Sequence, residues 1–241
     1  MDIVILHGWG SSPTRWEKTR KALEKSHRVY CPHLPGFDPQ KPLSSPWKIE
    51  DYHLWLENYL SQNHLSRPTI LAHSHGGRLA LSFTAQHPEQ LSHLILIGSA
   101  GLPPRNNLKR MIFFLPAKLG KAIFSLPPLQ KLSPFFRKTL YRLAREKDYF
   151  EASPVMQETM KNMLSLDLTE TAQKISIPTL LLWGRRDTYT PLWMGQKLAR
   201  LIPTSLLIIF SSGRHGLHLT HPQKIANKVE SFLKKTKANR I

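Results

Sequence analysis

Three residues far apart in the chain could together carry out nucleophilic catalysis. Ser74 is the central residue of an Ala-His-Ser-His-Gly segment. Asp187 follows the apolar run 178–184, and His215 follows the apolar run 205–210. A serine hydroxyl is a weak nucleophile at neutral pH, so it needs an imidazole to take its proton and a carboxylate to orient that imidazole. The chain supplies these three groups in the order serine, acid, histidine.

The pattern around Ser74 predicts a sharp turn between a strand and a helix. A short apolar run ends at the serine, and a helical pattern starts directly after it. Ala72 and Gly76 are small, as required where the strand and helix backbones nearly touch, and such a turn exposes the serine oxygen above the strand ends. On this segment alone, the tight turn of a nucleotide-binding fold is the alternative interpretation.

Strands and helices are predicted to alternate along most of the chain. We expect strands over 3–6, 27–32, 69–73, 93–98, 178–184 and 205–210, and helices over 13–25, 49–60, 75–87, 191–202 and 222–235. The runs 93–98, 178–184 and 205–210 are continuously apolar, which is typical of strands buried on both faces of a parallel sheet. The alternation predicts an α/β fold of three layers with right-handed crossovers.

This alternation breaks in the middle of the chain. Residues 102–171 are rich in proline and have helical patterning, so we expect a helical cap inserted into a core formed by 1–101 and 172–241. Between Arg105 and Lys147 there are eleven lysines and arginines against a single glutamate. The cap is therefore expected to be strongly basic, with interleaved apolar residues that pack on the core or line an acyl pocket.

Four motifs together resemble the α/β-hydrolase superfamily. They are His-Gly-Trp-Gly at 7–10, the Ser74 turn, Trp-Gly-Arg-Arg-Asp at 183–187, and His215 with a proline seven residues later. In that family the His-Gly loop follows the third of eight strands. Because only six residues precede His7, the resemblance implies a shortened sheet of about six parallel strands with an inserted helical cap.

The resemblance also implies roles for individual residues. Ser74 would be the nucleophile, His215 the general base and then acid, and Asp187 the carboxylate that orients it. The backbone N–H groups of Trp9 and His75 would form the oxyanion hole. His218 and His221 near His215 have a spacing that can bind a metal, but no cluster of carboxylates or cysteines joins them, so we expect neither a metal nor a cofactor.

Several other residues compete for roles in this site. We expect the substrate pocket to be lined by His7, His73, Phe113, Phe114, Phe124 and His218. His218 is an alternative base, and Asp167 and Glu170 are alternative acids. We favour His215 because it alone follows a predicted strand at the expected place, and Asp187 because the two alternative acids lie at the end of the predicted cap. Arg78 is interpreted as a structural ion-pair residue on its helix.

The predicted activity is hydrolysis of small to medium carboxylic esters through an acyl-enzyme intermediate. A serine nucleophile also suits lactones and some C–C bonds. The His-Gly-Trp-Gly loop and the basic cap are similar to those of esterases that act on methyl esters of acyl carrier proteins, so an acidic carrier is an alternative substrate. A ligand receptor, or a binder of anionic surfaces that retains the triad, is the alternative outside enzymes.

Composition sets limits on the partners and the compartment. The chain of 241 residues has a formal net charge of +18 and a pI of about 10.2, which favours anionic partners such as an acidic carrier protein or an anionic surface. It has no motif for specific nucleic-acid recognition. Cys31 is the only cysteine, and no apolar run approaches the roughly 20 residues that span a bilayer. We therefore expect a cytoplasmic protein without a transmembrane segment.

Overall fold

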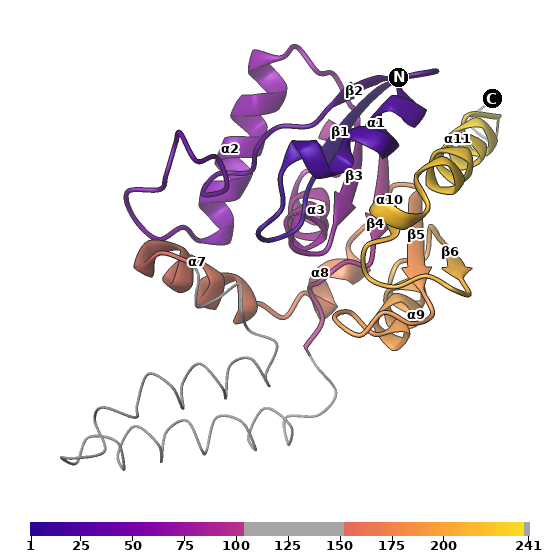
Figure 1. Ribbon diagram of the computed structural model, residues 1–241. Coiled ribbons are helices and arrows are strands. Elements are labelled where there is room, and N and C mark those ends of the chain that lie inside the picture. The colour runs from indigo at the N-terminus through magenta and orange to yellow at the C-terminus, as the bar shows by residue number, and fades with distance from the viewer. Residues whose placement is uncertain (104–151, 239–241) are drawn as a thin grey trace.

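The computed structural model describes residues 1–103 and 152–238 of the chain (Figure 1). The strands are β1 (Asp2–Leu6), β2 (Arg28–Tyr30), β3 (Thr69–His73), β4 (His93–Ile97), β5 (Thr179–Gly184) and β6 (Ser205–Phe210). The α-helices are α1 (Glu17–Leu23), α2 (Ile49–Gln62), α3 (His75–Gln86), α7 (Pro154–Leu164), α8 (Thr169–Gln173), α9 (Leu192–Leu201), α10 (Leu217–Thr220) and α11 (Pro222–Ala238). Two short 3₁₀ helices are η1 (Pro13–Trp16) and η2 (Pro88–Gln90).

The six strands form one parallel sheet in the order β2-β1-β3-β4-β5-β6. This confirms the predicted six-stranded parallel sheet. β3, which leads into Ser74, lies at the centre between β1 and β4. Because all strands run the same way, the loops that follow them meet at a single edge of the sheet, where ligands bind in open α/β folds.

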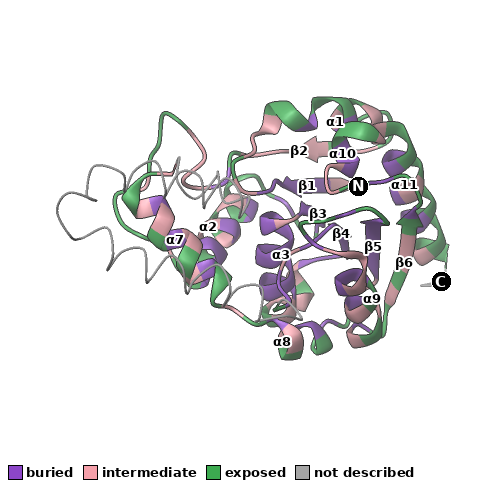
Figure 2. Ribbon diagram, turned by 60° about the horizontal axis from the view of Figure 1, so that its bottom comes forward, coloured by how far each residue is buried: buried purple, intermediate pink, exposed green. Residues whose placement is uncertain are grey.

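Helices cover both faces of the sheet, so the fold has three layers (Figure 2). Along β1, Val4 and Leu6 face one core, which α2, α3, α8 and α9 complete, whereas Ile3 and Ile5 face the other, which α1 and α11 complete. This alternation follows from the two-residue period of a strand. It explains why the central strands are apolar at nearly every position.

β6 differs from the expectation that all three continuous apolar runs would be buried on both faces. Leu206 is 46% exposed and Ile209 is 37% exposed. The reason is the position of β6 at the end of the strand order, where it has only one neighbouring strand. An apolar run therefore identified the strand correctly but not its place in the sheet.

Arg78 on α3 also differs from its predicted role. The side chain is buried and donates to the backbone carbonyls of Met163 and Leu166, and among the described residues no carboxylate pairs with it. Burial lowers the pKa of its guanidinium to about 10. Arg78 therefore ties α3 to the segment at the end of α7, instead of forming an ion pair.

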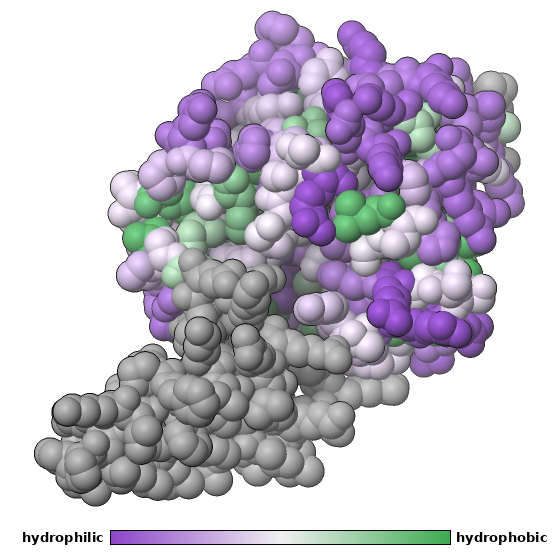
Figure 3. Space-filling view, in the orientation of Figure 1, coloured by the Kyte–Doolittle hydropathy of each residue, from purple (hydrophilic) through white to green (hydrophobic). Residues whose placement is uncertain are grey.

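The surface over α1 and α11 is predominantly hydrophilic in the view of Figure 3. None of the helices in residues 1–103 and 152–238 is both long enough and apolar enough to cross a membrane.

Candidate active site

The turn between β3 and α3 holds Ser74 in a backbone conformation with a positive φ of 52° and ψ −113°. A residue other than glycine rarely adopts this conformation, and here it projects the serine from the carboxyl edge of the sheet. The N–H of Ser74 donates to the Ile97 carbonyl at 3.2 Å, and its carbonyl accepts from Ala100 N–H at 3.0 Å. The turn is therefore held against the end of the neighbouring strand β4.

Gly76 allows the helix to start so close to the sheet. A methyl group at this position would lie 2.2 Å from the Leu6 carbonyl oxygen and 2.6 Å from that of His7. Its N–H donates to the His7 carbonyl at 3.1 Å. Only glycine permits this backbone approach, which joins the serine turn to the loop after β1.

Asp187 lies in the loop after β5 and its side chain is fully buried. One carboxylate oxygen, Oδ1, accepts from the N–H groups of Tyr189 and Thr190, each at 2.9 Å. The other, Oδ2, lies 2.9 Å from Thr190 Oγ1 and 2.8 Å from His215 Nδ1. The Trp183 indole N–H donates to the Thr190 carbonyl at 2.8 Å and so anchors the same loop. A buried carboxylate with this many donors is held in one orientation.

His215, in the loop after β6, is paired with this carboxylate. Because the Asp187 oxygen is an acceptor, the ring proton resides on Nδ1, which leaves Nε2 able to accept a proton. The side chain is 19% exposed, so the ring reaches the surface of the site. The structure thus brings together two of the three residues predicted for the triad.

Ser74 and His215 both follow strands at the same edge of the sheet, and no hydrogen bond between them is found in the described contacts. Ser74 is bonded to Ile97, and a methyl group on the next residue, Gly98, would lie 3.3 Å from His215 Nδ1 and 3.0 Å from Asp187 Oδ2. The ring of His73, the residue before the serine, is 4.6 Å from that of His215. Contacts between nucleophile and base are often long before substrate binds.

The backbone N–H groups predicted to form the oxyanion hole come from two separate segments. Those of Trp9 and His75 donate to no backbone carbonyl among the described turn and loop hydrogen bonds. Their side chains pack edge to face with ring centroids 5.1 Å apart. The two donors predicted for the oxyanion hole therefore belong to neighbouring residues.

His7 has a different position from the one predicted. The ring is fully buried, and its Nε2 accepts from Leu34 N–H at 3.0 Å, so Nδ1 carries the proton and donates to the Gly8 carbonyl at 2.9 Å. Burial lowers its pKa to about 4, so the ring is neutral. Both nitrogens are used by the backbone, and His7 holds the loop after β1 instead of lining a pocket.

His218 was also predicted in the pocket and weighed as an alternative base. It is buried, stacks on Trp16 at a centroid distance of 4.3 Å, and neither ring nitrogen has a hydrogen-bond partner in the described structure. Burial lowers its pKa to about 3. Without a carboxylate on either nitrogen, His218 lacks what a triad base needs, and its ring packs instead of facing a ligand.

The remaining predicted residues have other positions. His73 is buried with its ring 4.6 Å from that of His215, and Asp167 is exposed and hydrogen-bonded to Thr169. Phe113, Phe114 and Phe124 lie outside the described residues. Thr190 was missed by the sequence interpretation. Its spacing of three residues after the acid was the available signal, because a threonine there can bond back to the carboxylate.

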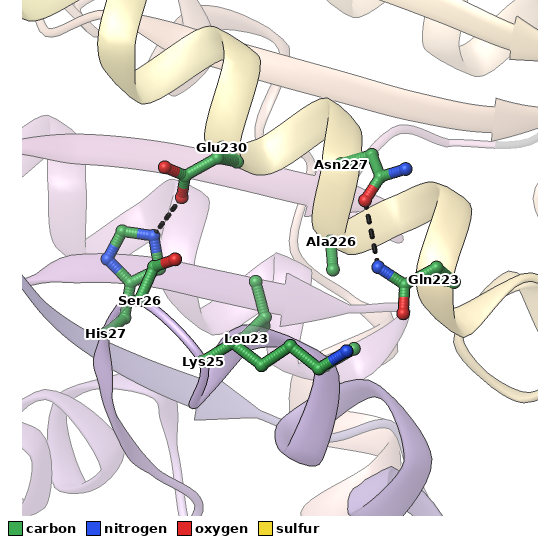
Figure 4. Close-up of a pocket in the computed structure, with 9 residues that line it drawn as sticks. Leu23, Lys25, Ser26, His27, Gln223, Ala226, Asn227 and Glu230 are labelled. Carbon is green, nitrogen blue, oxygen red and sulfur yellow. Dashed lines mark hydrogen bonds and ion pairs between the residues drawn. The ribbon is translucent and has the colours of Figure 1, made fainter.

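A pocket away from the triad loops lies between α1 and α11 (Figure 4). It is lined by Ala22, Leu23, Lys25, Ser26, His27, Gln223, Ala226, Asn227 and Glu230. Figure 4 shows the His27 ring turned toward Glu230. The distance between His27 Nε2 and Glu230 Oε2 is 2.6 Å. This pair links the end of α1 to α11, and no predicted triad residue lines the pocket.

A parallel sheet covered by helices, with a serine at a strained strand–helix turn and an Asp–His pair on two later loops of the same edge, defines a hydrolase built on a doubly wound sheet. A sequence model for the alpha/beta hydrolase fold matches residues 3–222. The chain belongs to the α/β-hydrolase family and is a hydrolase of that superfamily.

Known proteins of the family resemble the chain along most of its length. It is 24% identical to the pimeloyl-acyl-carrier-protein methyl ester esterase of Aliivibrio fischeri, over 96% of this chain and 93% of that protein. It is also 24% identical to a 2-hydroxy-6-oxononadienedioate/2-hydroxy-6-oxononatrienedioate hydrolase of Cupriavidus pinatubonensis, over 96% and 86%. The crystal structure of a bacterial membrane phospholipase A matches with a TM-score of 0.75 at 22% identity, over 98% of this chain and 79% of that one, and this match shows the shared fold.

Proposed function

We propose that the chain is a serine esterase in which Ser74, His215 and Asp187 form the catalytic triad. The observation that carries the proposal is the bond of 2.8 Å between His215 Nδ1 and the buried Asp187 carboxylate, at the sheet edge where the strained Ser74 turn projects. The tautomer that this bond fixes leaves Nε2 as the proton acceptor that a serine nucleophile requires.

The reaction would proceed in two steps. Ser74 Oγ attacks the ester carbonyl carbon as its proton passes to His215 Nε2, and the resulting oxyanion binds the N–H groups of Trp9 and His75. Each such donor contributes about 3 kcal/mol to lowering the barrier. His215 then protonates the leaving alcohol, which yields the acyl-enzyme. A water activated by His215 attacks the acyl group, and the acid leaves with Ser74 restored.

Stabilisation of the oxyanion depends on where the loop after β1 lies. The neutral His7 ring ties Gly8 in this loop to Leu34, and Gly76 N–H ties the start of α3 to the His7 carbonyl. These bonds hold the residues next to Trp9 and His75, whose N–H groups would bind the oxyanion. Preorganised donors cost no rearrangement during the reaction, which is why such loops are held tightly.

A fluorophosphonate should label the protein at Ser74. The triad would make this hydroxyl far more nucleophilic than other serines, and the phosphonyl adduct resembles the tetrahedral intermediate. Mass spectrometry of a proteolytic digest should find the added mass on the peptide that contains Ser74. The Ser74→Ala protein is the control and should remain unlabelled. Labelling of a different residue, or of none, would contradict the assignment of the nucleophile.

The methyl ester of an acyl group on an acidic carrier protein is the second candidate substrate. Its support is the similarity to the Aliivibrio fischeri esterase together with the excess of basic residues from 105 to 147. We propose that residues 102–171 form a cap and that its positive charge attracts the carrier. Opposite charges accelerate encounter between proteins, and salt screens this effect.

The salt dependence of kcat/KM distinguishes between the two candidate substrates. If the cap attracts a carrier, kcat/KM for an acyl-carrier methyl ester should fall about tenfold between about 50 mM and 500 mM NaCl. The rate on p-nitrophenyl acetate, which is uncharged, should change less than about twofold over the same range. Equal salt effects on both substrates would argue against docking of a carrier and leave the small-ester activity in place.

A further inference from the structure

A row of buried aromatic rings lies behind the proposed base. The ring of His73 is between those of His215, at 4.6 Å, and His218, at 4.5 Å, and the His218 ring stacks on Trp16 at 4.3 Å. The four residues come from the end of β3, the loop after β6, α10 and η1. The row therefore connects segments that the triad alone does not join.

His73 is the member of this row that is bonded to the base loop. Its Nε2 lies 3.0 Å from the His215 carbonyl oxygen. Since a carbonyl oxygen only accepts, Nε2 carries the proton and donates it, and Nδ1 is left with a lone pair. Leu217 N–H also donates to this carbonyl, at 3.0 Å. Two donors thus hold this carbonyl, and one of them is His73, the residue before the proposed nucleophile Ser74.

The other side of the His73 ring faces the loop after β1. Nδ1 is buried without a hydrogen-bond partner, and a methyl group at Gly8 would lie 2.9 Å from it. The same methyl group would be 3.4 Å from Ser74 Cβ. One ring therefore contacts the base loop and the oxyanion loop, and it is attached to the nucleophile through the backbone.

His73 remains neutral in this position. Burial, and then the neighbouring His218 and His215 rings, hold the pKa of His73 well below its usual value. A neutral ring adds no positive charge beside His215 at the moment when that residue takes a proton. Its hydrogen bond to the His215 carbonyl can therefore persist throughout the reaction.

We propose that His73 is a positioning residue, whose Nε2–H holds the His215 backbone so that the base ring points to Ser74. The proposal rests on the proposed function, in which His215 is the base. Because Asp187 fixes one side of the ring and His73 fixes the backbone that carries it, the two contacts together leave the ring little freedom to turn.

Three variants test this role. His73→Phe keeps a ring but removes the donor, and kcat on p-nitrophenyl acetate should fall about tenfold with little change in KM, the size expected for one lost hydrogen bond. His73→Gln retains an N–H at the same distance along the side chain and should recover most of the lost kcat. His218→Phe is the matched control, because it replaces a ring of the same row that has no hydrogen bond on either nitrogen, and should remain close to the wild type.

A second measurement does not depend on hydrolysis. The proton on His215 Nδ1, observed by NMR, should exchange with solvent about ten times faster in His73→Phe than in the wild type or His218→Phe, since a looser backbone opens the bond to Asp187 more often. Thermal melting of each variant checks the fold. If His73→Phe fails to fold, His73→Leu makes the same comparison with a smaller side chain.

The outcomes distinguish the alternatives. Unchanged kcat and exchange in His73→Phe, equal losses in His73→Phe and His218→Phe, or no recovery in His73→Gln would each overturn the positioning role. A wild-type protein that hydrolyses no ester would overturn the proposed function alone, because the proton exchange would still decide whether His73 holds His215.

Discussion

Alanine at position 74 should reduce kcat for ester hydrolysis by about 10⁴- to 10⁶-fold, while leaving the fold intact. The hydroxyl is the proposed nucleophile, and it is the only hydroxyl in the strained turn formed by residues 72–76. Alanine should fit among the same neighbours because its Cβ takes the place of the serine Cβ and only the hydroxyl is removed. Steady-state kinetics on p-nitrophenyl esters, with thermal melting as the check on folding, measures the effect.

His215→Ala should reduce kcat about as much as Ser74→Ala does. The kcat of the Ser74→Ala/His215→Ala double variant should be only slightly lower than that of either single variant. The two groups act in one proton transfer, so once either is absent the other has no partner to act on. Residual activity would come from the oxyanion donors and from binding. Losses that multiply in the double variant would contradict a shared role for the two residues.

The fold was predictable from the sequence because strands of a parallel sheet are long apolar runs separated by helical patterns. This correctly predicted β4, β5 and β6. The order of the strands across the sheet is set by long-range packing, which a single run does not record. The exposure of Leu206 on β6 follows from that order, and was therefore not predicted.

The residues proposed for the triad follow a related pattern. Ser74 comes directly after β3, Asp187 and His215 lie in the loops after β5 and β6, and the parallel sheet places all strand ends at one edge. The roles of the other histidines were not predictable, because their partners are distant in the chain. His7 accepts from the N–H of Leu34, and His73 donates to the carbonyl of His215. The sequence shows that an imidazole is present but not whether its nitrogens face a ligand or the backbone.

Arg78 illustrates the same limit. A cation on a helix next to an active-site turn is most often paired with a carboxylate, and this was predicted. The structure gives it two backbone carbonyls, those of Met163 and Leu166. Carbonyls near the end of a helix lack intrahelical partners and are common acceptors for arginine. Every residue type has such carbonyls, so nothing in the sequence marks them as partners for Arg78.

Asp187→Asn should lower kcat by about 10⁴-fold with little change in stability or KM. The amide oxygen can take the place of Oδ1 and still accept from the N–H groups of Tyr189 and Thr190. The amide nitrogen then occupies the place of Oδ2 and donates to His215 Nδ1. His215 must accept there, so its proton moves to Nε2, where it blocks transfer from Ser74.

The groups around position 187 allow Asp187→Asn to change the tautomer of His215 while the loop keeps its shape. Thr190 Oγ1 lies 3.0 Å from the Gly98 carbonyl as well as 2.9 Å from Asp187 Oδ2, so its proton can go to the carbonyl while its oxygen accepts from the new amide. Every buried polar atom thus keeps a partner, and the melting temperature should be nearly that of the wild type. Asp167→Asn, at an exposed carboxylate of the rival acid, is the control and should retain kcat within about twofold. A fully active Asp187→Asn protein, or an equal loss in Asp167→Asn, would remove the carboxylate of Asp187 from the mechanism.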